Sequence, residues 1–463
     1  MKRLAVLWMV LGGSVLWWSM VTAAERFATE PRVPQFLAGR EPTSPTVHPP
    51  DRWSTTENIA WKIDLPGLGW SSPIVWGSRV FLTTCVNSGD TTPPRKGLYI
   101  EDLDANKYPK PRDKHQWKVY CLDLESGSVV WEHIAHEAIP PKPHHLKNTL
   151  ASETPTTDGE RVYAYFGNVG VYCYTLDGRL VWSKLFEPRE TQMGWGTSIS
   201  PVLHQERLYI VNDNEEQSTL LALDKRTGDV IWQIDREDEK TNYATPFVWE
   251  NELRTEIVTS GIGWARSYDL DGKLLWRLKG LSVLAIPTPF AKFGNLYLTS
   301  GHVLWGGNPM YAIRPGASGD ISPGEEKRLG EHIAWYLEKA GPYHPTPLIV
   351  GEQIYVLLDR GFMTAYDAKT GAEIYGRTRM PNGRAFTSSP WTYDGKLFCL
   401  NEDGVTIVLR TGPKFEILHT NALTEDDMCM ATPVVAGDRL LIRSSARVYC
   451  VKGAATSTTA AGL

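Results

Sequence analysis

The chain has 463 residues, of which 42% are hydrophobic, 11% aromatic and 22% charged, and its formal net charge is −5. This is the composition of a folded globular protein, and the acidic balance with scattered Lys and Arg residues argues against a nucleic-acid partner. The 40 glycines and 31 prolines suit a turn-rich β protein.

Residues 1–24 have the pattern of a signal peptide. Lys2 and Arg3 precede an apolar run over residues 4–18, and small residues follow it before Glu25. We therefore expect an exported protein, periplasmic or secreted. If the segment stays uncleaved, its apolar stretch is long enough to act as a signal anchor, which is the only membrane contact that we expect.

Residues 25–57 are a Pro-rich lead segment, which we expect to lie extended over the surface of the protein. Residues 58–452 hold a repeat, described below, and residues 453–463 are small and polar and are expected to be a disordered tail.

A Ser/Thr-Pro step recurs eight times in the repeat region, and most successive steps are 43 to 46 residues apart. Such a period indicates an array of one supersecondary unit, and the two longer gaps are read as loop insertions. The steps begin at Ser72, Thr154, Ser200, Thr245, Thr288, Thr346, Ser389 and Thr432.

The second half of each unit ends in an aromatic residue after a tight turn. In the best copy, ALDKRTGDVIW (222–232), a strand end is followed by an Asp and a Gly suited to the turn, and a new strand opens with Trp232. One aromatic at a fixed place in each unit can fill the gap between neighbouring twisted sheets. The eight closing aromatics are Trp61, Trp131, Trp182, Trp232, Trp276, Trp335, Tyr375 and Phe415.

The two ends of the repeat complete each other. Trp61 has no strands of its own unit before it, and the last unit, 432–451, has strands but no aromatic after them. The sequence therefore predicts an all-β fold: an eight-bladed β-propeller of four-stranded antiparallel blades, closed by pairing the N- and C-terminal strands in one blade.

The phrase at 222–232 resembles the tryptophan-docking motif of the pyrroloquinoline quinone (PQQ)-like repeat. This repeat occurs in quinoprotein alcohol dehydrogenases and in the non-enzymatic propeller of the outer-membrane β-barrel assembly machinery. Two departures weigh on what the resemblance implies. No two cysteines are adjacent, although the dehydrogenases carry a vicinal disulfide over the quinone, and no cysteine precedes Cys85 to serve as a lipid attachment site.

The cysteines allow two disulfide pairs in an exported chain, Cys85 with Cys121 and Cys429 with Cys450. One sequence leaves the connectivity open.

Propeller geometry predicts where a site would lie. The loops that lead into each inner strand and the loops between second and third strands gather on one face, around the central channel. In these loops we single out Trp195, Asn148, Trp305 and Arg384 as candidate ligand-binding residues; the alternative is that they pack the loops together.

A possible calcium site lies in the loop NDNEEQS. Asn212, Asp213 and Glu215 offer the hard oxygen ligands that Ca²⁺ prefers, and a bound quinone would need calcium. The alternative is a tight turn capped by Asn and Asp side chains.

No sequence signature of catalysis is present, so no catalytic residue is assigned. We expect a monomeric, exported binding or scaffold module for a protein, peptide or glycan partner in the cell envelope, with no cofactor. The alternative is an atypical PQQ-dependent dehydrogenase that oxidises an alcohol or sugar and binds PQQ with Ca²⁺.

Overall fold

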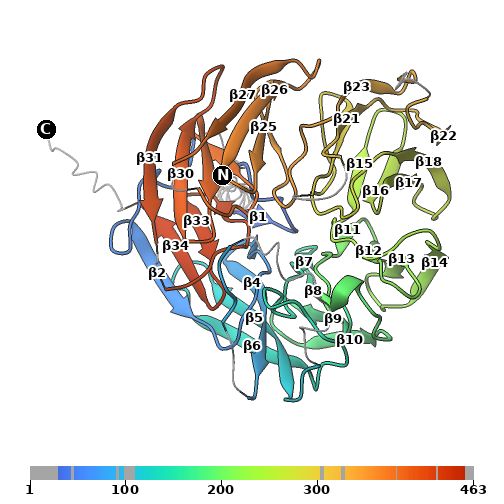
Figure 1. The fold of residues 1–463 in the computed structure, drawn as a ribbon. Helices are drawn as coiled ribbons and strands as arrows, with labels where there is room; N and C mark the ends of the chain where they lie inside the picture. The colour runs from blue at the N-terminus through green and yellow to red at the C-terminus, as the bar shows by residue number, and fades with distance from the viewer. Residues whose placement is uncertain are drawn as a thin grey trace, which may run out of the picture.

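The computed structural model describes residues 30–42, 46–89, 93–97, 110–302, 307–324, 329–381, 383–423 and 426–453. Its strands form eight sheets arranged radially around a central axis, as Figure 1 shows. Each sheet contains four neighbouring antiparallel strands, and two sheets gain a fifth strand. The predicted eight-bladed all-β propeller is confirmed.

We number the blades from the first complete one. Blade 1 contains β3 (Ile74–Trp76), β4 (Arg79–Asn87), β5 (His115–Asp123) and β6 (Val129–Ala138), with β1 (Arg32–Val33) added at its inner edge. Blade 2 contains β7 (Thr156–Thr157), β8 (Arg161–Phe166), β9 (Gly170–Thr175) and β10 (Leu180–Leu185). Blade 3 contains β11 (Val202–His204), β12 (Arg207–Asn212), β13 (Thr219–Asp224) and β14 (Val230–Asp235), and the 3-10 helix η2 (Gln192–Gly194) precedes it. Blade 4 contains β15 (Phe247–Glu250), β16 (Thr255–Ser260), β17 (Trp264–Tyr268) and β18 (Leu274–Lys279), with β22 (Gly319–Asp320) at its outer edge.

The second half of the ring follows the same plan. Blade 5 contains β19 (Phe290–Lys292), β20 (Asn295–Thr299), β21 (Met310–Ile313) and β23 (Ile333–Leu337). Blade 6 contains β24 (Leu348–Val350), β25 (Gln353–Leu358), β26 (Phe362–Asp367) and β27 (Glu373–Arg379). Blade 7 contains β28 (Trp391–Tyr393), β29 (Lys396–Leu400), β30 (Val405–Arg410) and β31 (Ile417–Ala422). Blade 8 contains β32 (Val434–Ala436), β33 (Arg439–Arg443), β34 (Arg447–Lys452) and, from the other end of the chain, β2 (Ile59–Asp64).

The closing tryptophans dock on the following blade. In five blades the indole N–H donates to a backbone carbonyl in the turn before the next blade's outer strand, at 2.9 to 3.0 Å. The ring lies against the glycine of that turn: a Cβ on Gly228, whose φ is 78°, would lie 2.5 Å from the ring of Trp182. A side chain there would displace the indole, so Gly and Trp act together. The donor and acceptor pairs are Trp61 and Leu124, Trp131 and Leu176, Trp182 and Lys225, Trp232 and Leu270, and Trp335 and Ala368.

Blade 4 departs from this pattern. The Trp276 indole instead donates to the buried carboxylate of Glu256, at 2.7 Å. The insertion between β21 and β23 runs back along the blade, and its strand β22 pairs in parallel with β18. The insertion therefore supplies the packing that the docking turn supplies elsewhere, with Ala317 and Ile321 buried beside Trp276.

The Ser/Thr-Pro steps form a circle of hydroxyl groups around the axis, here named the hydroxyl ring. At six of its eight junctions the backbone N–H of one step donates to the side-chain oxygen of the next, at 2.9 to 3.1 Å. This explains why Ser or Thr occupies the position before each proline. The linked pairs are Ser72 and Thr154, Thr154 and Ser200, Ser200 and Thr245, Thr288 and Thr346, Thr346 and Ser389, and Ser389 and Thr432.

The propeller is closed by strands from both ends of the repeat. Strand β2 pairs antiparallel with β34 from Ile59 to Asp64, as predicted. The buried guanidinium of Arg443 adds a link between blades 8 and 1, since it donates to the carbonyls of Ser71 (2.7 Å) and Thr83 (2.6 Å).

The lead segment is packed more deeply than the expected surface position. Strand β1 pairs with β3, and Val33 and Trp53 are 2% and 3% exposed. Farther along, the Gly39 carbonyl accepts from Val435 N–H in blade 8 (2.8 Å), and the Arg40 side chain donates to the carbonyls of Thr346 and Pro347 beside blade 6 (2.9 and 3.0 Å). The lead therefore crosses the ring from one side to the other.

The two candidate disulfide pairs are not formed, and all six cysteines are buried free thiols. Cys85 lies opposite Trp117 and Cys121 lies opposite Phe81 in the β4–β5 register, which separates the two sulfurs by four residues along the strands. Among the described residues, no helix has the length and apolar character needed to cross a bilayer. The signal segment and the tail beyond Gly453 fall outside the described residues.

Candidate functional site

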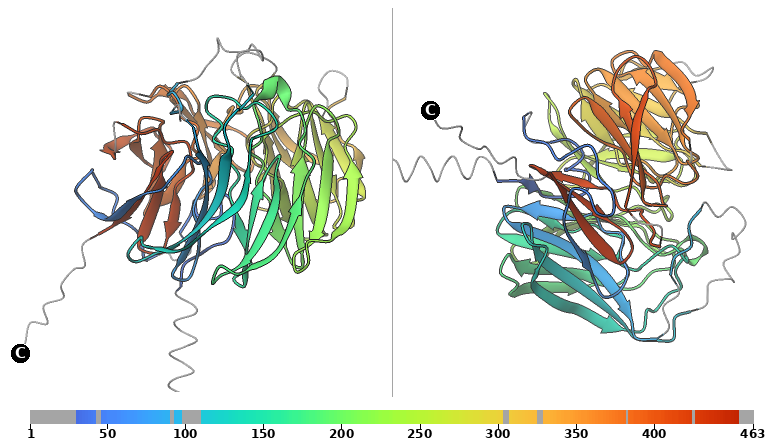
Figure 2. Two further views of the ribbon diagram at one scale, coloured as in Figure 1. Left: turned by 90° about the horizontal axis from the view of Figure 1, so that it is seen from below. Right: turned by 90° about the vertical axis from the view of Figure 1, so that its left-hand side faces the viewer.

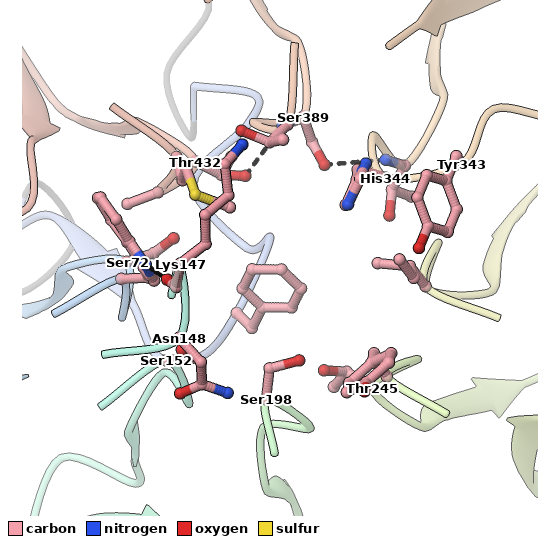
Figure 3. Close-up of a pocket in the computed structure, with 18 of the residues that line it drawn as sticks. Ser72, Lys147, Asn148, Ser152, Ser198, Thr245, Tyr343, His344, Ser389 and Thr432 are labelled. Carbon is pink, nitrogen blue, oxygen red and sulfur yellow. Dashed lines mark hydrogen bonds between the residues drawn. The ribbon is translucent and has the colours of Figure 1, made fainter. Parts of the chain in front are cut away.

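A cavity of about 280 Å³ occupies the centre of the ring, and we call it the central cavity. Residues from all eight Ser/Thr-Pro steps or their adjoining loops surround it, so every side of the propeller contributes to its wall. Figure 3 shows Ser72, Thr245, Ser389 and Thr432 of the hydroxyl ring around this space, with Lys147 and His344 on opposite sides.

The central cavity is blocked at one end by the lead segment. Phe36 lines it, between Pro34, whose carbonyl accepts from Thr157 N–H (2.9 Å), and Gly39 on the far side of the ring. The other end is surrounded by the loops that lead into the inner strands, on the face where η2 lies at the top of the left panel of Figure 2. The cavity is therefore a blind pocket that faces the predicted loop face.

Two of the four predicted ligand-binding residues meet at this pocket. Trp195 and Asn148 both line it, and the Asn148 amide donates to the carbonyls of Trp195 and Thr197, each at 3.0 Å. Its oxygen accepts from Leu150 N–H (2.8 Å). The hydrogen bonds of Asn148 thus hold two loops together, and the Trp195 ring packs edge-on against His145, with ring centroids 5.9 Å apart.

The other two predicted residues do not join them. Arg384 is exposed in the loop before blade 7 and is not part of the cavity wall. Trp305 lies outside the described residues.

An ion pair joins the cavity wall to blade 7. Lys147, in the loop between blades 1 and 2, contacts both carboxylate oxygens of Glu402 in blade 7, at 2.8 and 3.0 Å. Glu402 also accepts from the backbone N–H of Gly97 (2.8 Å), in the insertion of blade 1. Burial lowers the pKa of Lys147, and Glu402 opposes that effect. These contacts hold together loops of blades 1 and 7 that are far apart in the sequence.

A second polar cluster lies on the opposite wall. The carboxylate of Asp359 accepts from the backbone N–H groups of Tyr343 (2.9 Å) and His344 (3.1 Å) and contacts Nδ1 of His344. His302 packs edge-on against Tyr343, with ring centroids 4.8 Å apart, and burial lowers the pKa of His302. The Asp359 carboxylate therefore fixes the orientation of the His344 imidazole, which lines the cavity.

Several polar atoms of the wall have no hydrogen-bond partner among the described residues. They are Ser72 Oγ, Trp195 Nε1, Tyr243 OH and Thr387 Oγ1. Buried polar atoms are normally paired, so unpaired ones in a cavity wall are candidates for contact with a ligand.

The residues of the predicted calcium site lie away from this pocket, at the seam between blades 3 and 4. The Asp213 carboxylate accepts from Arg236 through both oxygens, at 2.8 and 2.9 Å, and contacts the Asn242 amide. Glu215 accepts from the Thr241 hydroxyl (2.7 Å). No group of three or more His, Cys, Asp or Glu suited to a metal ion occurs in the described ranges.

With Asp213 neutralised by a buried guanidinium, these residues as arranged do not fit a calcium ion beside a quinone in the central cavity. Calcium binding at Asn212, Asp213 and Glu215 stays a prediction, and the described contacts of Asn214, which caps its own loop, agree with the turn alternative.

Sequence reasoning missed much of the cavity wall. The hydroxyl groups belong to the Ser/Thr-Pro steps, but a recurring step in the sequence indicates a period and not a shared cavity wall. The Lys147–Glu402 pair joins residues 255 positions apart, and Phe36 lies in a segment without repeat character, so neither had a local signal.

Comparisons with known proteins agree with this architecture. The family model described as "Outer membrane protein assembly factor BamB", a PQQ-repeat family, matches residues 115–374, more than half of the chain. No curated protein matches.

Two solved structures share the fold. BamB from Moraxella catarrhalis is 12% identical, with a TM-score of 0.56, over 85% of this chain and 97% of that one. The computationally designed Ika8 protein is 10% identical, with a TM-score of 0.55, over 85% of this chain and 99% of that one. The docked tryptophans, the eight blades and the match of the family model together place the chain in the BamB-like family of PQQ-repeat β-propellers.

Proposed function

We propose that this chain is an exported binding propeller that holds a segment of a partner protein on its loop face, in the cell envelope, and acts as a scaffold rather than as a catalyst. The observation that carries the proposal is the blind central cavity, whose wall combines aromatic rings with polar atoms that lack a partner. Membership of a family described by an outer-membrane assembly factor supports the envelope location.

Site-specific photocrosslinking in cells tests this proposal. A photoreactive residue replaces Arg384, which is exposed on the loop face, and, as the matched control, Arg226, which is exposed in the turn between β13 and β14. We expect a discrete crosslinked protein at position 384 and none at position 226. No product at position 384, or the same products at both positions, contradicts a partner on the loop face.

Titration with PQQ separates this function from the dehydrogenase alternative. The purified mature chain is titrated with PQQ, with and without Ca²⁺, while tryptophan fluorescence is followed. We expect no saturable quenching at micromolar quinone. Saturable, calcium-dependent quenching would overturn the proposal and favour a quinoprotein.

A further inference from the structure

We propose that the central cavity binds the C-terminal carboxylate of a polypeptide. The inference rests on the proposed binding function and names the chemistry of the bound segment. It follows from the hydrogen-bonding character of the wall, from its charge and from the shape of the pocket.

The wall offers hydrogen-bond donors. Four hydroxyl-ring side chains that line the cavity already use an oxygen lone pair to accept a backbone N–H: Thr245, Thr346, Ser389 and Thr432. No described residue accepts a hydrogen bond from these four hydroxyls, so their protons are left to donate.

The unpartnered atoms of the wall have the same character. The Trp195 indole N–H can only donate, and the hydroxyls of Ser72, Tyr243 and Thr387 can donate as well as accept. Ser72 is 2% exposed, and leaving its hydroxyl without a partner costs free energy. A wall of donors selects a ligand that is rich in acceptors.

The charge of the wall suits a singly charged anion better than a multiply charged one. Among the described lining residues there is no Asp or Glu, and the positive side chain is Lys147, whose charge Glu402 already balances. Arg, the residue best matched to phosphate, is also missing from the described wall. A carboxylate offers four acceptor sites with one negative charge, which suits many neutral donors better than a dianion would.

The shape of the pocket favours the end of a chain. Because the lead segment blocks the far end at Phe36, a segment that enters from the loop face cannot pass through. The rings of Trp70, Trp195 and Tyr343 leave an apolar wall for the last side chain. Capture of a terminal carboxylate by a set of donors is an established mode of peptide recognition.

Calorimetric titration of the mature chain tests the inference with three probes. They are the peptide acetyl-Gly-Gly-Phe with a free carboxylate, the same peptide with a C-terminal amide, and phenylacetate as a small free acid. We expect the acid peptide to bind at least tenfold more tightly than the amide and than phenylacetate. Equal affinity of acid and amide, or no binding of either at millimolar concentration, overturns carboxylate recognition. Phenylacetate binding as tightly as the acid peptide overturns the chain-end assignment.

Two variants locate the binding. Ser72→Ala and Trp195→Phe each remove an unpartnered polar atom without removing any described side-chain hydrogen bond, so both should fold. Each should lower the preference for acid over amide about fivefold. The control is Trp264→Phe, since Trp264 is not part of the described cavity wall. An unchanged preference in both variants contradicts the assignment. A crosslink that persists at position 384 while the peptides fail to bind would overturn this inference and leave the proposed function standing.

Discussion

Tryptophan serves two purposes in this chain, and its hydrogen bond tells them apart. Five of the closing tryptophans give their indole N–H to the next blade, as Trp232 does to the Leu270 carbonyl (3.0 Å). Trp195 in the cavity wall gives its N–H to no described residue. The first kind holds blades together, whereas the second lines the central cavity.

Replacing a docked tryptophan should lower stability strongly. Trp232→Ala removes an interblade ring and its hydrogen bond, and we expect the free energy of unfolding to fall by about 3 to 5 kcal/mol. Denaturant unfolding measures the change, with Trp264→Ala as the control, because Trp264 is part of no hydrophobic core cluster. A fall no larger than that of the control would show that the ring at Trp232 is not an interblade core residue.

Glu153 should make stability depend on pH. Its carboxylate is 1% exposed and accepts from the Thr197 hydroxyl (2.6 Å), and burial raises its pKa from 4.5 to about 7. Because the folded pKa lies above the unfolded one, the stabilising contribution is complete below about pH 4.5 and is lost as the pH rises through 7.

Glu153→Gln should remove this dependence. Relative to the parent, we expect the variant to gain about 2 to 3 kcal/mol in the free energy of unfolding between pH 5 and pH 8. Urea unfolding of both proteins at several pH values measures the difference. A difference that stays constant with pH would mean that Glu153 does not titrate in this range.

At the scale of elements, the repeat was predictable and the lead was not. The turn glycine and the closing tryptophan recur at a fixed distance in the sequence, so each blade can be recognised from a short stretch such as 222–232. The lead makes contacts that no periodic pattern encodes, such as the Arg40 side chain with carbonyls 306 and 307 residues away. The loop face and its residues Trp195 and Asn148 could be predicted because they follow from the repeat. The blocked far end could not be predicted, because it is formed by the lead segment, which has no repeat.

The lead should be a structural element rather than a removable extension. Arg40→Ala leaves two buried carbonyls without their donor, and we expect the free energy of unfolding to fall by about 2 to 3 kcal/mol. Arg52→Ala, in the same segment but at an exposed position, is the control and should change little. Equal stabilities of the two variants, measured by denaturant unfolding, would show that the hydrogen bonds of Arg40 do not stabilise the fold.

For the whole molecule, closure of the ring depends on a strand from each end of the chain. Strand β34 pairs with both β2 and β33, so its loss would open blade 8. A chain that ends at Ala446 should therefore lose cooperative unfolding, whereas one that ends at Gly453 should unfold like the full chain. Circular dichroism and tryptophan fluorescence, followed together during thermal unfolding, measure this. Coincident, unshifted transitions in the shorter chain would show that the ring does not need β34.

The hydroxyl ring divides the molecule into equal halves. Its two missing links lie between Thr245 and Thr288 and between Thr432 and Ser72, so the hydrogen bonds form two arcs of four blades each. The halves are also joined by β2 and β34, which come from different ends of the chain. A polypeptide cut between blades 4 and 5 would thus yield two fragments with complementary edges. We expect these two fragments to reassemble into the propeller when they are mixed.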